Sequence, residues 1–233
     1  ILSIDAGGSL RAGPESAGAS PGPVCYDAGG ENPTITDANI ILGYLNPNHL
    51  VGGAVKLNKE KAANVFKEKI AEPLGLSLEE AAYGAHLISA SNMIRAIKAV
   101  STERGRNPQN YSLFAFGGNG PLFAAGMADA IGIKQVIVPP SPGLFSSFGL
   151  LYADVEHHYS RTFRRLLTAA DPEELTVAWE GLAKEAIDEL NKEGFAGASA
   201  VIERSASLHY KGQIYELSVP APSGNFDAKK LAE

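Results

Sequence analysis

The residues whose types and spacing best suit ligand chemistry are Gly117, Gly118, Asn119 and Gly120, followed by Pro121. Glycine has no Cβ, so the backbone can take positive φ and a ligand can approach it closely. An apolar, aromatic run precedes the glycines and a helix-compatible run follows them, which predicts a strand, a turn and a helix N-terminus. Such a turn presents free N–H groups to an anion or a polar heterocycle. We therefore expect a nucleotide site. A tight turn without a ligand is the alternative, because the spacing matches no phosphate-loop pattern.

A second glycine pair, Gly7 and Gly8, follows Asp5 inside the apolar segment 1–12. The pattern DxGG is typical of phosphate-binding hairpins in actin-like ATPases. Asp-Ala-Gly-Gly is also an ordinary hairpin turn between two short strands. We interpret it as that turn.

Cys25, His157 and His158 are the remaining candidates for nucleophilic or metal chemistry. A cysteine nucleophile needs a base, and no histidine lies near Cys25 in the sequence, so we interpret it as a packed structural thiol. Residues 155–163 alternate like a strand, on which adjacent histidines point to opposite faces and cannot easily share an ion. The sequence therefore predicts no metal site.

A polar segment opens an apolar helix expected from Ile40 to Leu45, with Thr36 or Asp37 as its N-cap. The polar group at this cap could also bind a ligand or a metal, but capping alone explains it. The sequence by itself leaves the two roles open.

The longest expected helix runs from Leu78 to about Arg104, because Ser77 and Glu80 form a capping box at its start. Small and branched apolar residues recur along it at near-helical spacing, which predicts one buried face. These residues are Ala81, Ala85, Ile88, Ile94, Ile97 and Val100.

Four segments are apolar or alternate in polarity, as strands do. They are residues 111–116, 135–138, 200–210 and 214–219. We predict that they form one mixed sheet on which helices 122–131 and 172–193 pack.

The chain divides by composition into three regions. Residues 1–36 are a glycine- and proline-rich hairpin and loop region, 37–104 a helical block, and 105–233 an α/β nucleotide-binding lobe, truncated at its C-terminal end. Since the chain starts without methionine and ends within an expected helix, we expect it to be a fragment of a larger protein.

Composition excludes several classes of protein. The 233 residues are 45% hydrophobic and 20% charged, which is typical of a globular protein. A formal net charge of −6 without a basic run argues against nucleic-acid and membrane partners. The single cysteine excludes an internal disulfide framework and favours a cytoplasmic location.

Four motifs occur along the chain in the order GPESAGASPGPVCY, TDANIILGYL, FAFGGNGPLFA and LHYKGQIYELSVP. On these motifs the sequence resembles the hydantoinase A/oxoprolinase family, which includes acetone carboxylase subunits, over essentially all 233 residues. The resemblance implies an α/β fold, a ribonuclease-H-like lobe of the actin and sugar-kinase ATPase type with an inserted helical block. The chain would be the second half of that ATPase core within a larger hydantoinase A-type subunit.

The resemblance also implies site residues and cofactors. Gly117, Gly118 and Gly120 match glycines on the adenosine side of the ATP site, with Asn119 between them. Asp37 and Asn39 match the family's TDAN motif and are candidate catalytic residues without an assigned role. The implied cofactors are ATP and Mg²⁺.

The implied function is ATP-driven carbonyl activation that opens a cyclic imide or lactam, with a hydantoinase B-type subunit or domain as partner. Two alternatives stay open. One is a subunit of an ATP-dependent acetone-type carboxylase, and the other is a non-catalytic, nucleotide-gated assembly module.

Overall fold

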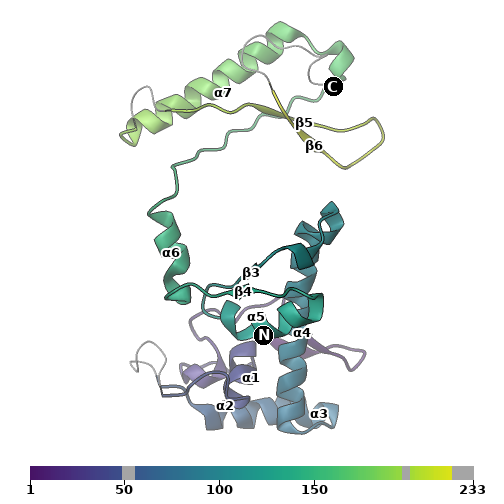
Figure 1. Ribbon diagram of the computed structural model, residues 1–233, viewed down its shortest axis with the longest axis vertical. Helices are drawn as coiled ribbons and strands as arrows, with labels where there is room; N and C mark the ends of the chain where they lie inside the picture. The colour runs from purple at the N-terminus through teal and green to yellow at the C-terminus, as the bar shows by residue number, and fades with distance from the viewer. Residues whose placement is uncertain (49–55, 196–199, 222–233) are drawn as a thin grey trace. The chain divides into compact units, whose positions relative to one another are not determined.

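The computed structural model describes residues 1–48, 56–195 and 200–221, and Figure 1 shows their elements. The chain forms two compact units, Ile1–Ala153 and Asp154–Glu233, which are described separately below. This division falls within the region that the composition assigns to the nucleotide-binding lobe. The glycine turn thus shares a unit with the N-terminal hairpin and the helical block.

The first unit opens with the predicted hairpin. Strands β1 (Leu2–Ile4) and β2 (Leu10–Ala12) pair antiparallel, with Leu2 opposite Ala12 and Ile4 opposite Leu10. Leu2 is buried, so the hairpin contributes one face to the core.

Helix α1 (Ile35–Ile41) begins one turn earlier than expected. Its N-cap is Thr34, and neither Thr36 nor Asp37 holds that position. The backbone of Thr34 is extended, and its hydroxyl accepts a hydrogen bond from the N–H of Asp37. In return, the carboxylate of Asp37 accepts from the N–H of Thr34. The predicted cap was wrong because Asp37 occupies the N3 position of a capping box.

The helical block continues with α2 (Lys59–Phe66), the π-helical turn η3 (Lys67–Ala71) and α3 (Glu72–Leu74). Helix α4 (Leu78–Val100) follows, and its predicted capping box is confirmed. It ends at Val100 rather than near residue 104, where a short 3₁₀ turn, η4 (Thr102–Arg104), takes over.

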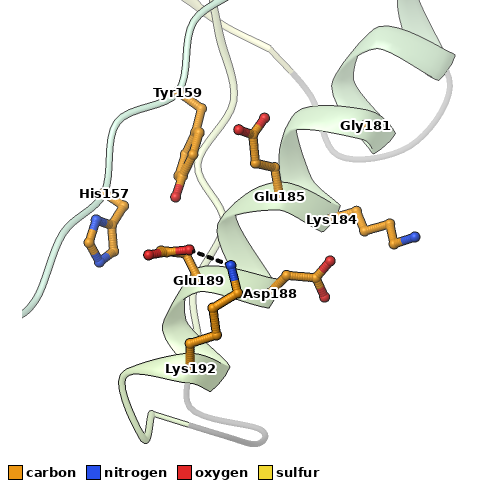
Figure 2. Close-up of a pocket in the computed structure, with 8 residues that line it drawn as sticks. All are labelled: His157, Tyr159, Gly181, Lys184, Glu185, Asp188, Glu189 and Lys192. Carbon is orange, nitrogen blue, oxygen red and sulfur yellow. Dashed lines mark hydrogen bonds and ion pairs between the residues drawn. The ribbon is translucent and has the colours of Figure 1, made fainter.

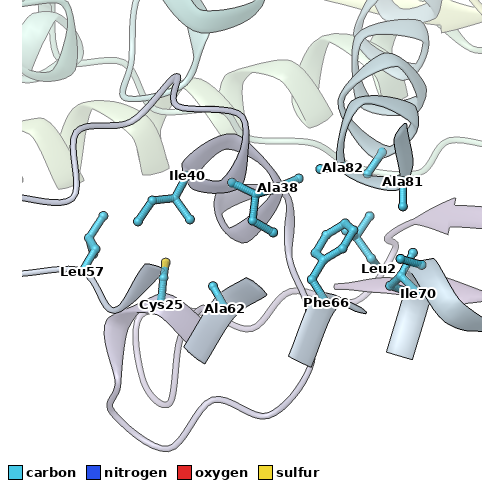
Figure 3. Close-up of a cluster of buried hydrophobic side chains, with 13 residues drawn as sticks. Leu2, Cys25, Ala38, Ile40, Leu57, Ala62, Phe66, Ile70, Ala81 and Ala82 are labelled. Atoms are coloured by element: carbon cyan, nitrogen blue, oxygen red, sulfur yellow. The ribbon is translucent and has the colours of Figure 1, made fainter. Parts of the chain in front are cut away.

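The core of this unit lies between the hairpin, α1, α2 and the first turns of α4 (Figure 3). Phe66, Ile40 and Ile70 are its largest fully buried apolar side chains. Ala81 and Ala85 of α4 are buried as predicted, and their small size lets the helices approach closely. The prediction that Val100 belongs to the buried face of α4 was wrong. Val100 is 56% exposed, because the core ends beneath the N-terminal half of this helix.

After the 3₁₀ turn η5 (Pro108–Asn110), the predicted strand, turn, helix and strand follow. They are β3 (Leu113–Phe114), α5 (Gly120–Ile131) and β4 (Val136–Ile137), with β3 and β4 paired in parallel. The turn η6 (Pro142–Leu144) and helix α6 (Phe145–Leu150) complete the unit.

The second unit contains η7 (Leu167–Ala169), α7 (Pro172–Lys192) and the antiparallel strands β5 (Ser205–Leu208) and β6 (Leu217–Pro220). Asp171 caps α7 as the sequence indicates. The strand expected over 155–163 was wrong: this segment is extended but pairs with no strand among the described residues.

The prediction of a single mixed sheet was also wrong. Within the described ranges, the strands form three separate two-stranded sheets, β1·β2, β3·β4 and β5·β6. Alternation in polarity marks β5 and β6 as strands but does not say which strand each one meets. They pair with each other, with Leu208 opposite Leu217.

None of the helices in the described part of the chain combines the length and apolar character needed to cross a membrane. The cytoplasmic location expected from the cysteine count stays a prediction.

Candidate functional site

The glycine turn predicted from the sequence links β3 to α5. Gly117 has φ +81°, a left-handed conformation that favours glycine, and its N–H donates to the carbonyl oxygen of Pro142 at 2.7 Å. Gly118 and Gly120 do not have positive φ, although the sequence suggested that each glycine could use it. Glycine is therefore required for its backbone geometry at Gly117 alone in this turn.

The turn lies at the carboxyl ends of two parallel strands. The N–H of Leu113 donates to the carbonyl of Gln135 at 2.9 Å and that of Ala115 to Ile137 at 2.8 Å, which places the segments after β3 and β4 at one edge. Ligands of open α/β sheets bind at this edge. The bond from Gly117 to Pro142 joins the two connecting loops there.

Space beside the turn is open. A Cβ added to Gly118 would meet no atom within 4 Å, and both Gly118 and Asn119 are exposed. Asn119 occupies the N-cap of α5 but makes no capping hydrogen bond with its side chain. No side-chain cap covers this helix start, which suits binding of an anionic or polar group. Pro121 has no N–H, and the N–H of Leu122 donates to the carbonyl oxygen of Asn119 at 3.1 Å.

Sequence reasoning missed Ser141 and the aromatic residues around it. Ser141 has φ +50° and lies four residues after the end of β4, on the loop that meets the glycine turn. The rings of Phe114, Phe116 and Phe145 lie 5.3 to 5.9 Å apart by centroid, and both phenylalanines of the first strand region are more than 40% exposed. The run SPG after a predicted strand was the available signal for the loop.

Asp37, a candidate catalytic residue, is fully buried. Its carboxylate accepts from the N–H groups of Val24 and Cys25 at 3.2 and 2.7 Å, and from the N–H and hydroxyl of Thr34 at 2.9 and 2.7 Å. The side chain therefore fastens the loop before it to the start of α1. This arrangement stabilises the fold and leaves no exposed carboxylate oxygen.

Asn39, the other candidate, is also fully buried, and its Oδ1 lies 2.9 Å from Nδ1 of His86 on α4. Sequence reasoning missed His86, because one histidine in a long helix carries no pattern. Burial lowers the pKa of His86, so the imidazole is neutral near pH 7. Its ring stacks on Phe123 of α5, with centroids 4.2 Å apart.

The structure does not place Asp37 or Asn39 at the glycine turn. Within the described residues, neither side chain has a hydrogen bond to residues 117–120. The TDAN segment reaches α5 only indirectly, through His86 and Phe123.

Cys25 behaves as the packed thiol that the sequence indicates. It is fully buried, and burial, followed by the nearby Asp37 carboxylate, raises the pKa of its thiol. A thiol held in its neutral form is a poor nucleophile.

The DAGG segment is the expected hairpin turn. Asp5 Oδ1 accepts from the N–H groups of Gly7 and Ser9 at 2.9 and 3.0 Å, and Asp5 Oδ2 pairs with Arg11 Nε at 2.7 Å. These bonds lower the pKa of Asp5, and the bond from the N–H of Ser9 contributes most. The carboxylate is therefore occupied by its own turn.

In the second unit a charged pocket lies along α7, facing His157 and Tyr159 (Figure 2). Glu185 and Glu189 border it, and Lys192 bonds to Glu189 at 2.9 Å. His157 Nε2 lies 2.8 Å from Glu193 Oε2. Such exposed pairs are typical of a solvated helix face.

The described residues contain no group of three or more His, Cys, Asp or Glu side chains that could hold a metal ion. The N–H groups at the glycine turn suit a phosphate or a heterocycle, and the turn and the loop facing it, residues 114–120 and 138–145, contain no carboxylate for Mg²⁺.

The fold is mixed α/β, and the glycine turn is open to solvent where two parallel strands end and α5 begins. The chain belongs to the hydantoinase/oxoprolinase family. The family model matches residues 1–159, and the model of the hydantoinase/oxoprolinase C-terminal domain matches residues 164–231. The resemblance seen in the four motifs is thereby confirmed.

Relatives include both hydrolases and carboxylases. The chain is 37% identical over 235 residues to caprolactamase subunit alpha of Pseudomonas jessenii, covering 100% of this chain and 34% of the relative. The crystal structure of the ATP-dependent caprolactamase superposes with a TM-score of 0.67, at 37% identity, over 99% of this chain and 34% of that one. The nucleotide-free structure of acetone carboxylase superposes with a TM-score of 0.66 at 30% sequence identity. The match covers 100% of this chain and 34% of that one. The chain thus spans about a third of the length of these relatives.

Proposed function

We propose that this chain is the nucleotide-binding second half of the ATPase core of a larger hydantoinase A-type subunit. The observation that carries the proposal is the open glycine turn at the carboxyl ends of β3 and β4, directly before α5. The relatives support ATP as the ligand, since both solved structures are named as ATP-dependent enzymes. A ribonuclease-H-like lobe of the actin type is the fold expected of such a core.

In the proposed role, residues 117–120 bind and orient the nucleotide. The N–H groups at the start of α5 face a polar or negatively charged part of the ligand, and Gly118 leaves room for it. The exposed rings of Phe114 and Phe116 offer faces on which a planar base can stack. ATP, when bound, would supply the phosphoryl group that activates a ring carbonyl toward attack by water.

The substrate we propose is a cyclic imide or lactam, and a hydantoinase B-type subunit or domain is the proposed partner. The caprolactamase relative supports a lactam, because it is named for a caprolactam and its solved structure is named as ATP-dependent. In this chain the buried Asp37 and the neutral thiol of Cys25 are unsuited to attack a carbonyl. Activation by positioned phosphate rather than by a protein nucleophile is consistent with that.

A carboxylase is the second candidate function. The likeness to acetone carboxylase favours it almost as strongly, with a TM-score of 0.66. The full-length subunit, together with its partner, should be assayed with ATP and either a lactam or a ketone plus bicarbonate. ATP turnover with the lactam alone supports the hydrolase, and turnover that needs ketone and bicarbonate supports the carboxylase.

The nucleotide site is tested by Gly118→Val in the full-length subunit. A Cβ at Gly118 meets no protein atom within 4 Å, so the fold should be retained, whereas the valine side chain fills the space proposed for the nucleotide. We expect affinity for Mg-ATP, measured by calorimetry, to fall at least about tenfold, which is about 1.4 kcal/mol. Gly126→Val is the matched control, because Gly126 lies on α5 in equally open space. An unchanged affinity for Mg-ATP in a folded Gly118→Val protein would show that this turn has only a structural role.

A further inference from the structure

Three side chains from three helices form a continuous chain of contacts between the TDAN segment and α5. Asn39 on α1 bonds to His86 on α4, at 2.9 Å between Oδ1 and Nδ1. The imidazole stacks on Phe123 of α5, with centroids 4.2 Å apart and ring planes 11° from parallel. Asn39, His86 and Phe123 are 0%, 9% and 2% exposed, so all three side chains are buried. Phe123 lies in the first turn of α5, three residues after Gly120.

The orientation of the imidazole is fixed by Asn39. Because an amide oxygen only accepts, Nδ1 of His86 carries the proton and donates it, and Nε2 keeps its lone pair. Burial lowers the pKa of His86, and the ring therefore stays neutral and flat against Phe123. Tyr44 adds an edge contact to the same ring, with centroids 5.1 Å apart.

The amide of Asn39 is retained at a cost to stability. Its Nδ2 is buried without a hydrogen-bond partner among the described residues. An unsatisfied buried donor is destabilising, whereas an apolar residue of similar size would avoid the penalty. A role for Asn39 in orienting His86 explains why a polar side chain occupies this place.

Helix α5 packs against α4 beside the main core. In the described part of the unit, the apolar cluster of the hairpin, α1, α2 and α4 contains none of the buried residues of α5. His86 stands between them: it bonds into α1 on one side and stacks on α5 on the other. This ring contact directly links the side chain that bonds to α1 with the first turn of α5.

We infer that Asn39, His86 and Phe123 are positioning residues, which hold α5 and the glycine turn before it in the arrangement that binds the nucleotide. The inference rests on the proposed function for the ATP site, and it assigns a role to the asparagine of TDAN. These residues do not touch the nucleotide. They act by fixing the helix whose N-terminus does.

The test uses the full-length subunit with its partner and three variants, His86→Ala, His86→Phe and Phe123→Ala. Losing the stack should raise the KM for ATP about tenfold in both alanine variants while kcat changes less than twofold, since ligand binding is weakened equally in ground and transition states. His86→Phe keeps an aromatic ring for the stack but cannot hydrogen-bond to Asn39, so its KM should lie between those of His86→Ala and the wild type. Leu87→Ala, which changes an exposed neighbour on α4, is the control and should leave the KM unchanged.

A second readout is independent of ATP. Hydrogen exchange of the α5 amides should rise at least about tenfold in His86→Ala and return toward wild type in His86→Phe, while α2 stays protected. Unchanged α5 exchange in both alanine variants would overturn the inference, whatever the kinetics show. If the wild-type subunit binds no ATP but α5 exchange responds as expected, the proposed function fails and the coupling of His86 to α5 stands.

Discussion

The N–H of Gly117 donates to the carbonyl oxygen of Pro142 at 2.7 Å, so the loops that follow two parallel strands are tied together beside the start of α5. This bond requires Gly117 to hold φ +81°. The turn is therefore a fixed element of the fold, with its open side at Gly118.

Replacing Gly117 by alanine should strain this turn. A Cβ at positive φ costs about 1–2 kcal/mol, so the free energy of unfolding in urea should fall by about that amount. The matched change Gly118→Ala should cost much less, because its φ is not positive and its Cβ meets no atom within 4 Å. Equal stability of the two variants would show that the left-handed backbone at Gly117 is not required.

Asp37→Ala tests whether that residue is structural or catalytic. Four hydrogen bonds to its buried carboxylate would be lost, leaving the N–H groups of Val24, Cys25 and Thr34 without this acceptor. Since each unsatisfied buried donor costs about 1–3 kcal/mol, we expect a loss on the order of 4 kcal/mol in unfolding free energy. Asp27→Ala removes an exposed carboxylate paired with Lys61 and should cost far less. A stable Asp37→Ala protein without ATP turnover would instead indicate a catalytic role.

Local signals in the sequence were enough to predict most elements of the fold. The capping box of Ser77 and Glu80 and the hairpin turn at Asp5 were predicted and are present. Each depends on residues that are close in the sequence, so no knowledge of the rest of the chain is needed. The pairing of β5 with β6 rather than with β3 depends on distant segments, and the polarity pattern carries no information about it.

The candidate site was predictable only in part, for the same reason. The glycine turn could be placed because strand, glycines and helix are consecutive in the sequence. His86 and Phe123 are far apart along the chain, and their contact exists only because α4 and α5 pack together. Asp37 looked like a possible ligand because a carboxylate at a helix start suits both capping and binding, and only its burial separates the two.

The segment 1–233, expressed alone, should hydrolyse no ATP. Phosphoryl transfer needs donors and Mg²⁺ ligands around the phosphates, and the described residues contain no group of three or more His, Cys, Asp or Glu side chains that could hold a metal ion. We expect release of phosphate at the rate of the buffer blank, and turnover in the full-length subunit with its partner. Turnover by the segment alone would contradict the proposal that it is half of an ATPase core. Circular dichroism of the same sample would show that the segment is folded.

The stability of the protein should decline at alkaline pH through Cys25. Burial and then Asp37 raise the pKa of this thiol in the folded state above its ordinary value of 9.0, so the folded protein keeps the proton while the unfolded chain releases it. The stabilisation is therefore complete below about pH 9 and is lost as the pH rises above it, by up to about 1.4 kcal/mol per pH unit. Urea unfolding at pH 7.5 and pH 10 should show a larger decrease for the wild type than for Cys25→Ala, which lacks this proton. Other groups titrate in both proteins, so the difference between them isolates the thiol. Identical decreases in the two proteins would mean that Cys25 ionises equally in the folded and unfolded states.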